Sequence, residues 1–218
     1  MNIYLASGNK NKKREFSQIL SEYTIITPAD KNISFDPEET GSSFFENSMI
    51  KALALWNIVH EPVLADDSGI CIDALDGAPG IYSSRYAGPA FPHGKPDGAK
   101  IPQAEQNIFL INQTNEAIAS GIDSSAFPNG PRSCRYVCSM VLLLTPDRFF
   151  LSQETMEGTL VKTIKDAAGN GGFGYDPLFY LPTLHKTAAE LSSDEKNAIS
   201  HRGKAIRAMT AVIKNIHF

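Results

Sequence analysis

The segment Ile3-Tyr4-Leu5-Ala6-Ser7-Gly8-Asn9-Lys10 decides the class of fold. Its apolar first half predicts a short buried strand, and Ser7-Gly8-Asn9 predicts a turn at the end of that strand. Apolar side chains then recur at helical spacing from Lys10 to about Glu22, and residues 24–27 are rich in β-branched side chains. This part of the chain is therefore predicted to form a strand–helix–strand unit.

Strands dominate the middle of the chain. Residues 63–65 predict a buried strand that leads into an acidic turn, Asp66-Asp67-Ser68-Gly69. Residues 135–144 give the strongest strand pattern, and 149–155 with 158–164 predict two more strands that pair antiparallel. Helices between strands at the start, followed by strand after strand, predict an α/β fold with a mixed sheet flanked by helices.

Capping residues mark the starts of three further helices. Ser43 with Glu46, and Ser192 with Glu195, have the spacing of a capping box. Ser200 is placed to cap the last helix.

The composition is that of an ordinary globular protein of 218 residues, long enough for one large domain or two small lobes that share a sheet. Its net charge of -4 argues against nucleic-acid binding through a large basic surface. The apolar runs are too short to span a membrane and no secretory signal is recognisable, so we expect a cytoplasmic protein. Cys71, Cys134 and Cys138 form no CxxC pair and are expected to be reduced, buried thiols.

Residues 7–12 form a candidate anion site, because they follow a strand and open a helix, where backbone N–H groups favour negative charge. Lys10 and Lys12 add positive charge, although the spacing is not that of a Walker A loop. A solvated basic turn is the alternative for this segment taken alone.

Asp66 and Asp67 form a candidate metal site. Adjacent side chains on a strand point to opposite sides, so the two carboxylates are predicted to have different roles. One carboxylate, together with Glu38 or Glu39 from the preceding loop, suits Mg²⁺ bound to phosphates. Ordinary turn chemistry explains the motif equally well at this point.

A glycine-rich loop at 169–177 and a basic segment around His201 are candidates for reading a base. Phe173 and Tyr175 can stack on a planar ring, and Asp176 can accept from a ring N–H or a hydroxyl. His201 and Arg202 can donate to a carbonyl oxygen, and Lys196 can reach phosphate or base. The alternative for the glycine-rich loop is a flexible linker, and the alternative for the segment around His201 is a solvated helix start. The first segment also contains Gly174, between Phe173 and Tyr175, and Lys196 lies five residues before His201 in the second.

These motifs occur in a fixed order along nearly the whole chain. They are Ser7-Gly8-Asn9 with Lys12, Glu39-Thr40-Gly41 running into Glu46-Asn47 and Lys51-Ala52, Ala65 to Gly69, Gly77 to Gly80 with Ser84-Arg85-Tyr86, Gly172 to Pro177, and Lys196 to Gly203. In this order they closely resemble the non-canonical purine NTP pyrophosphatase family, which is also called the inosine triphosphate pyrophosphatase, Ham1 or RdgB family.

The resemblance implies an elongated mixed β-sheet flanked by helices, in a single domain over 1–218 with two lobes and a nucleotide cleft between them. It further implies a homodimer that hydrolyses ITP, dITP and XTP between the α- and β-phosphates, releasing a monophosphate and pyrophosphate. Such an enzyme keeps deaminated purines out of DNA and RNA.

The resemblance also assigns residues. Glu39 and Asp67 match the metal-binding acids, which take Mg²⁺, and Asp67 matches the proton acceptor; Asp66 is then expected to be structural. The residues of this chain that match the family's triphosphate-binding loop are Ser7, Gly8, Asn9, Lys10, Asn11 and Lys12. The remaining nucleotide-binding positions match Ser68, Phe173, Gly174, Tyr175, Asp176, Lys196, His201 and Arg202.

These roles agree with elementary chemistry. Hypoxanthine and xanthine carry a carbonyl at C6 where adenine carries an amino donor, so donors such as Arg202 favour the former. Phosphoryl transfer needs charge neutralisation, from Lys10, Lys12 and Mg²⁺, and an aligned water, from Asp67 directly or through the metal.

Two other functions remain open from the residues alone: a Maf-type pyrophosphatase, and a nucleotide-binding sensor without turnover. Intact Glu39 and Asp67 disfavour the sensor. The loops 88–102 and 120–133 match no functional motif, so we expect them to bear on dimer surface or cleft access. The preferred base and any contribution of Glu38 to the metal site stay undecided.

Overall fold

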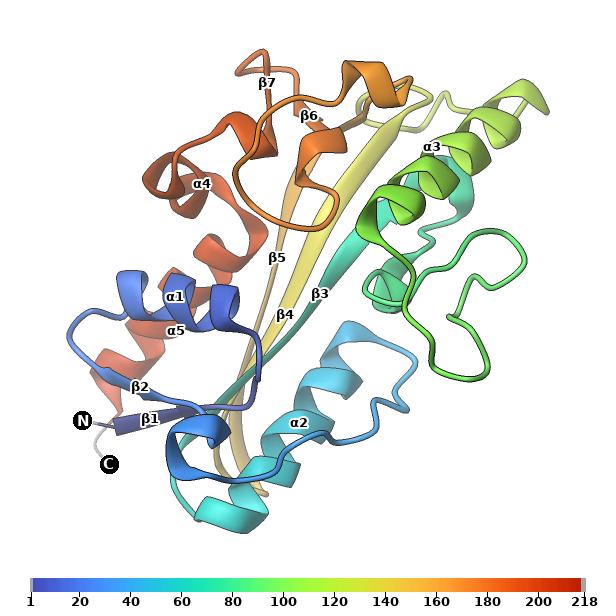
Figure 1. Ribbon diagram of the computed structural model, residues 1–218. Coiled ribbons are helices and arrows are strands. Elements are labelled where there is room, and N and C mark those ends of the chain that lie inside the picture. Colours follow the sequence, from blue (N-terminus) through green and yellow to red (C-terminus); the bar gives the residue numbers. More distant parts are fainter. Residues whose placement is uncertain (1, 217–218) are drawn as a thin grey trace. The chain divides into compact units, whose positions relative to one another are not determined.

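The computed structural model describes residues 2–216 and contains a seven-stranded sheet in the order β2-β1-β3-β4-β5-β6-β7 (Figure 1). β1 pairs in parallel with β2 and β3, whereas β5, β6 and β7 pair antiparallel. The mixed sheet predicted from sequence is therefore confirmed. The strands are β1 Asn2–Leu5, β2 Thr24–Ile26, β3 Val63–Ile72, β4 Ser133–Thr145, β5 Arg148–Leu160, β6 Phe179–Leu181 and β7 Lys186–Thr187. The α-helices are α1 Lys10–Ile19, α2 Phe44–Val59, α3 Gln103–Ala119, α4 Ser193–Ile199 and α5 His201–Asn215.

The chain divides into two compact units. Unit 1 comprises 1–68, 137–155 and 197–218, and unit 2 comprises 69–136 and 156–196. Strands β3, β4 and β5 contribute residues to both units, so each unit is described by its own contacts.

Unit 1 has two apolar cores, one on each face of its part of the sheet. Leu64 of β3 belongs to the core that α1 and α5 complete with Phe16 and Ile206. Its neighbours Val63 and Ala65 belong to the core that α2 completes with Ala52 and Leu55. Because side chains alternate along a strand, β3 is apolar on both faces before it reaches Asp66 and Asp67.

The most important correction concerns the acidic stretch, which is not a turn. Residues 66–69 lie inside the uninterrupted strand β3, which runs from Val63 to Ile72. A buried carboxylate usually disfavours such a strand, but here Asp66 and Asp67 each meet cationic side chains on their own face. The backbone therefore has no need to leave the sheet.

A second correction concerns 149–155 and 158–164, which were predicted as two strands. They form one strand, β5, which ends at Leu160. Gly158 does not break it, because the glycine serves close packing: a Cβ there would lie 2.5 Å from the ring of Phe179.

The helix starts predicted from capping residues agree with the structure more closely than the other predicted helix ends. Ser43 caps α2, and Ser200 caps α5 by accepting from the Gly203 N–H at 3.0 Å. Helix α1 ends at Ile19 rather than near Glu22. The three cysteines are free and buried, as expected. None of the helices in residues 2–216 has both the length and the apolar character needed to cross a bilayer.

The core of unit 1 gives a stability prediction. Leu55 is fully buried on α2, so Leu55→Ala removes apolar contacts and leaves a cavity. We expect the free energy of unfolding in urea to fall by about 2–5 kcal/mol. Ile58 on the same helix is 52% exposed, and Ile58→Ala should change the free energy of unfolding by less than about 0.5 kcal/mol. Equal losses in the two variants would show that α2 is not seated as described.

Candidate active site

Asp66 is completely enclosed in unit 1 by an ion-pair network. Its Oδ2 lies 2.9 Å from Lys12 Nζ and 3.2 Å from Arg202 Nε. Burial alone raises the pKa of the Asp66 carboxyl, but the positive charges of Lys12, Arg202 and Lys51 reverse this and hold that pKa well below its ordinary value. Asp66 is therefore ionised and committed to the network.

Arg202 connects this network to two further segments. Its Nη1 lies 2.5 Å from Glu15 Oε2, and its Nη2 donates to Ser68 Oγ at 2.7 Å. Burial lowers the pKa of Arg202, but the carboxylates of Asp66 and Glu15 outweigh burial and raise that pKa above its usual range. The guanidinium thus joins α5, α1 and β3 through charged hydrogen bonds.

Asp67 points to the opposite face of β3, toward α2. Its Oδ1 lies 3.2 Å from Lys51 Nζ, and its Oδ2 accepts from Asn47 Nδ2 at 3.3 Å. The pKa of Asp67 is raised because burial outweighs the attraction of Lys51 and Lys12, and Glu39 adds like-charge repulsion. A carboxylate of this kind is a better proton acceptor than one in the Asp66 environment.

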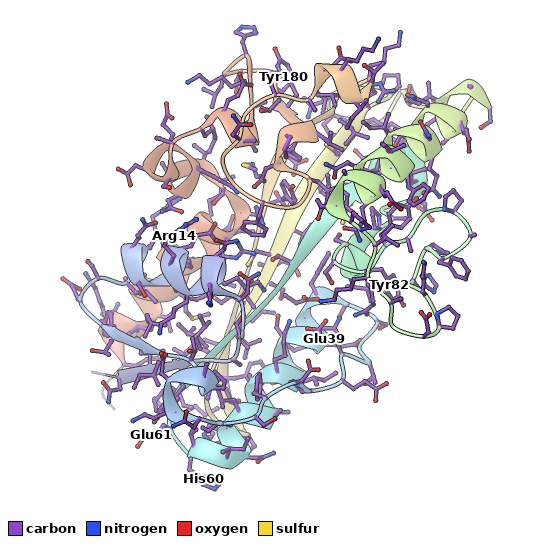
Figure 2. The ribbon with its side chains drawn as sticks, in the orientation of Figure 1. Arg14, Glu39, His60, Glu61, Tyr82 and Tyr180 are labelled. Atoms are coloured by element: carbon purple, nitrogen blue, oxygen red, sulfur yellow. The ribbon has the colours of Figure 1, made fainter. Side chains whose placement is uncertain are left out.

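Glu39 and Asp67 converge on one cation. The ammonium of Lys51 lies 2.7 Å from Glu39 Oε1 and 3.2 Å from Asp67 Oδ1 (Figure 2 labels Glu39). Burial lowers the pKa of Lys51, but the carboxylates of Asp67, Asp66 and Glu39 raise it overall. Glu38, by contrast, is exposed.

The chemistry of these two acids suits Mg²⁺. Glu39 and Asp67 offer hard carboxylate oxygens, and Mg²⁺ is typically held by one or two carboxylates together with phosphate oxygens and waters. Within residues 2–216 no group of three or more His, Cys, Asp or Glu side chains is placed to hold a metal by itself.

The residues of the predicted triphosphate loop form the capped start of α1. Asn9 Oδ1 accepts from the backbone N–H of Asn11 at 2.8 Å and of Lys12 at 3.3 Å, and Ser7 Oγ accepts from Asn9 N–H at 3.1 Å. Gly8, Asn9 and Lys10 are exposed, and the first turn has no acidic residue. The helix start is therefore electropositive. Lys12 is engaged by Asp66.

The glycine-rich loop in unit 2 is organised around Asp176. Its Oδ2 accepts from Phe173 N–H at 2.7 Å and from Lys196 Nζ at 2.6 Å, while the Lys196 ammonium lies 5.1 Å from the centre of the Phe173 ring. At Gly172 φ is +70°, and a Cβ would lie 2.1 Å from Asp176 Oδ2, so only glycine fits. Phe173 is half-buried.

Tyr175 differs from Phe173. It is 4% exposed, and its hydroxyl donates to the carbonyl of Ser83 at 3.0 Å. Its ring is thus part of the core of unit 2 rather than an open stacking surface. His201 and Arg202, both buried, begin α5 in unit 1, directly after the capping residue Ser200.

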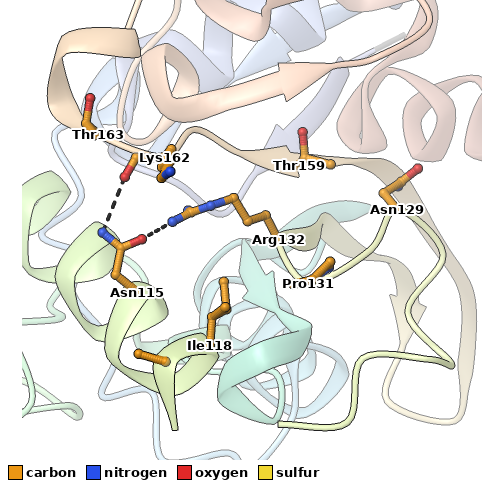
Figure 3. A pocket seen from close by; sticks show the side chains of 9 residues that line it. Asn115, Ile118, Asn129, Pro131, Arg132, Thr159, Lys162 and Thr163 are labelled. Carbon is orange, nitrogen blue, oxygen red and sulfur yellow. Dashed lines mark hydrogen bonds between the residues drawn. The ribbon is translucent and has the colours of Figure 1, made fainter. Parts of the chain in front are cut away.

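A pocket of about 670 Å³ in unit 2 contains none of the predicted site residues (Figure 3). Arg132 faces it, donating to Val161 O at 2.9 Å and to Asn115 Oδ1. Asn115 in turn donates to Lys162 O at 3.3 Å. These bonds tie α3 to the segment after β5, so Arg132 holds the scaffold together. The pocket is lined by Asn115, Ile118, Ala119, Asn129, Pro131, Arg132, Thr159, Lys162 and Thr163.

Asn47, Lys51 and Glu15 touch the candidate site but were given no role from sequence. Asn47 and Lys51 lie four residues apart on α2, a spacing that puts both side chains on one face. Two polar residues on one face of a helix that also carries a buried apolar stripe are a sequence signal of a polar site at that face. Glu15 has no such signal, because its partner Arg202 is remote in sequence.

The Asp66 network leads to a pH prediction for stability. Because the pKa of Asp66 is depressed by folding, its ionised form stabilises the protein above the pKa of an unfolded Asp, about 3.9, and this contribution is lost as the pH falls below it. In metal-free solution the wild type should therefore be more stable than Asp66→Asn at pH 7, and the gap should narrow as the pH falls below about 4. Urea unfolding at several pH values measures the gap; one that is constant or widens in acid would contradict the assignment.

Comparison with known proteins identifies the family of this chain. The model of the Ham1 family matches residues 3–212. The dITP/XTP pyrophosphatase of Treponema denticola is 48% identical over 98% of this chain and 99% of its own length. That of Salmonella typhimurium is 36% identical, over 98% of each chain.

Solved structures give the same result. A HAM1 protein from Coxiella burnetii has a TM-score of 0.81 and 35% identity, over 99% of this chain and 100% of its own. The Ham1 protein of Staphylococcus aureus has a TM-score of 0.78 and 33% identity, over 98% of each chain. On sequence and fold together, this chain belongs to the Ham1 family.

Proposed function

We propose that this protein is a dITP/XTP pyrophosphatase: it hydrolyses ITP, dITP and XTP to the nucleoside monophosphate and pyrophosphate. Relatives named dITP/XTP pyrophosphatase match it over nearly their whole length, and the family match favours this activity over a Maf-type enzyme. The observation that carries the proposal is the convergence of Glu39 and Asp67 on the ammonium of Lys51.

Asp67 is the residue we assign to the chemistry. Its carboxylate accepts a proton from the water that attacks the phosphoric anhydride, so that a P–O bond to water forms as the bond to pyrophosphate breaks. Its raised pKa suits this task, because a base works best when its pKa is near the working pH. Glu39 and Asp67 would hold Mg²⁺, which supplies neutralisation of phosphate charge.

The start of α1 is assigned to the triphosphate. Ser7 to Asn11 lie at an electropositive helix start, with the exposed Lys10 among them, which is a favourable place for anionic oxygens. Lys12 adds positive charge from within the Asp66 network. The nearby Ser68 hydroxyl, oriented by Arg202, completes this group.

The loop 173–176, with Lys196, is assigned to the base. The half-buried Phe173 offers a ring for stacking, and Asp176, fixed by Lys196, offers a carboxylate acceptor to a ring N–H. Tyr175 shapes this loop from the core. For unit 1 by itself, we propose His201 and Arg202 as nucleotide-binding residues, because their N–H donors suit a C6 carbonyl better than an amino group. We also propose a single functional domain over 1–218, a homodimer, and a cytoplasmic location.

Substrate specificity is the first test. With Mg²⁺, the purified protein should convert ITP and XTP to monophosphate and pyrophosphate at least about tenfold faster, in kcat/KM, than ATP, because a mismatched donor leaves buried groups unpaired. Products are identified by chromatography and by a pyrophosphate assay. Release of orthophosphate with a diphosphate, or equal turnover of ATP, would refute the proposal.

The role of Asp67 is tested by Asp67→Asn, which keeps the shape of the side chain and removes the base. We expect kcat for ITP to fall by about 10²- to 10⁴-fold. The control is Asp30→Asn, since Asp30 is a surface carboxylate paired only with Lys13 among the ion pairs of unit 1 described here. It should keep wild-type kcat. Substantial activity in Asp67→Asn would place the base elsewhere.

A further inference from the structure

We propose that Asn47 is a positioning residue that fixes Asp67 relative to the loop that carries Glu39. The inference rests on the proposed function, because it concerns the same two acids. It adds an uncharged residue that contributes no carboxylate. The side chain of Asn47 joins the loop that carries Glu39 to the strand that carries Asp67, and the proposed site needs both segments in fixed positions.

Asn47 is fully buried on α2, and its carboxamide is used at both ends. Its Oδ1 accepts from the backbone N–H of Gly41 at 2.9 Å, and its Nδ2 donates to Asp67 Oδ2 at 3.3 Å. The N–H of Gly41 needs a hydrogen-bond acceptor, and only the oxygen of the Asn47 carboxamide can accept. The carboxamide therefore cannot be flipped to exchange its oxygen and nitrogen. The NH₂ group is therefore held toward Asp67.

Asn47 and Lys51 together fix the plane of the Asp67 carboxylate. Lys51 lies one helical turn beyond Asn47 and meets Oδ1, while Asn47 meets Oδ2. Each oxygen thus has one donor from the same helix, and rotation of the carboxylate breaks both contacts. Because α2 is seated by its apolar core, this pair of donors is rigid.

The loop before α2 is closed onto Asn47 so tightly that position 41 has no space for a side chain. A Cβ at Gly41 would lie 2.6 Å from Glu46 Cβ and 2.7 Å from Asn47 Oδ1. The glycine is needed here for close approach. Glu39 lies two residues earlier in this loop, so the Gly41–Asn47 bond sets how Glu39 approaches Lys51.

An uncharged amide is suited to this place in a way that its near relatives are not. Aspartate keeps an acceptor for Gly41 N–H but puts a second carboxylate against Asp67. Leucine keeps the volume but makes neither bond, which leaves the Gly41 N–H without its partner. These two substitutions therefore separate the link to the loop from the link to Asp67.

The control lies on the same helix. Ser48 is also fully buried, and its Oγ donates to Ser139 O at 2.8 Å, without contact to either acid in the contacts described for unit 1. Ser48→Ala removes a buried hydrogen bond of α2 while leaving the Asn47 contacts intact. It reports what general loosening of the helix does to activity.

The experiment measures kcat and KM for ITP at saturating Mg²⁺, and the exchange of the Gly41 amide hydrogen by NMR in metal-free protein. We expect Asn47→Asp and Asn47→Leu each to lower kcat by at least about tenfold with KM changed less than about threefold, as for an interaction used in the transition state. Gly41 should stay protected in Asn47→Asp and lose protection in Asn47→Leu. Ser48→Ala should keep wild-type kcat and Gly41 protection.

The outcomes are separable. If both Asn47 variants keep kcat within about twofold of wild type, or if Ser48→Ala loses as much, the positioning role is refuted while the pyrophosphatase activity stands. If Asn47→Leu does not fold, Gly41→Ala probes the same contact from the loop side and should also lower kcat; unchanged kcat there overturns the inference. A wild type that leaves ITP intact refutes the proposed function, and the Gly41 exchange then still decides whether Asn47 holds the loop.

Discussion

The alternation of side chains along β3 is the constraint on which the rest of the candidate site depends. Because neighbouring residues face opposite sides of a sheet, Asp66 and Asp67 enter different surroundings although they are adjacent in sequence. Asp66 faces α1 and α5 and meets Lys12 and Arg202. Asp67 faces α2 and meets Asn47 and Lys51. One strand thereby separates a carboxylate that holds unit 1 together from the one to which we assign the chemistry.

The surroundings of Asp66 and Asp67 differ in how far neighbouring positive charges offset the rise in carboxyl pKa that burial causes. Two cations lie against Asp66, and their attraction keeps its pKa low. Asp67 shares its cation with Glu39, so burial and like charge prevail and its pKa rises. Both acids lie against Lys51, and their carboxylate oxygens are ligands that a divalent cation prefers. A site of this kind gives up stability in exchange for function.

The class of fold, the helix caps and the opposite orientation of the two aspartates could be predicted from sequence alone, because these follow from local periodicity and strand geometry. The sequence pattern misplaced the acidic stretch as a turn, since the ion partners Lys12 and Arg202 that permit a continuous strand come from distant segments. It predicted two strands, 149–155 and 158–164, where the structure has the single strand β5 and Gly158 makes room for the Phe179 ring. Likewise, the core role of Tyr175 depends on Ser83, a contact that no local pattern encodes.

The central claim is that Asp66 stabilises the fold whereas Asp67 is held at the expense of stability. The most direct test is to compare the urea unfolding midpoints of Asp66→Asn and Asp67→Asn with that of the wild type, at neutral pH and without metal. A raised pKa means that the folded state disfavours ionised Asp67, so Asp67→Asn should unfold at no lower urea concentration than the wild type. Asp66→Asn should unfold at a clearly lower one, because Lys12 and Arg202 lose their shared partner. Equal destabilisation of both variants would contradict the division of roles across β3.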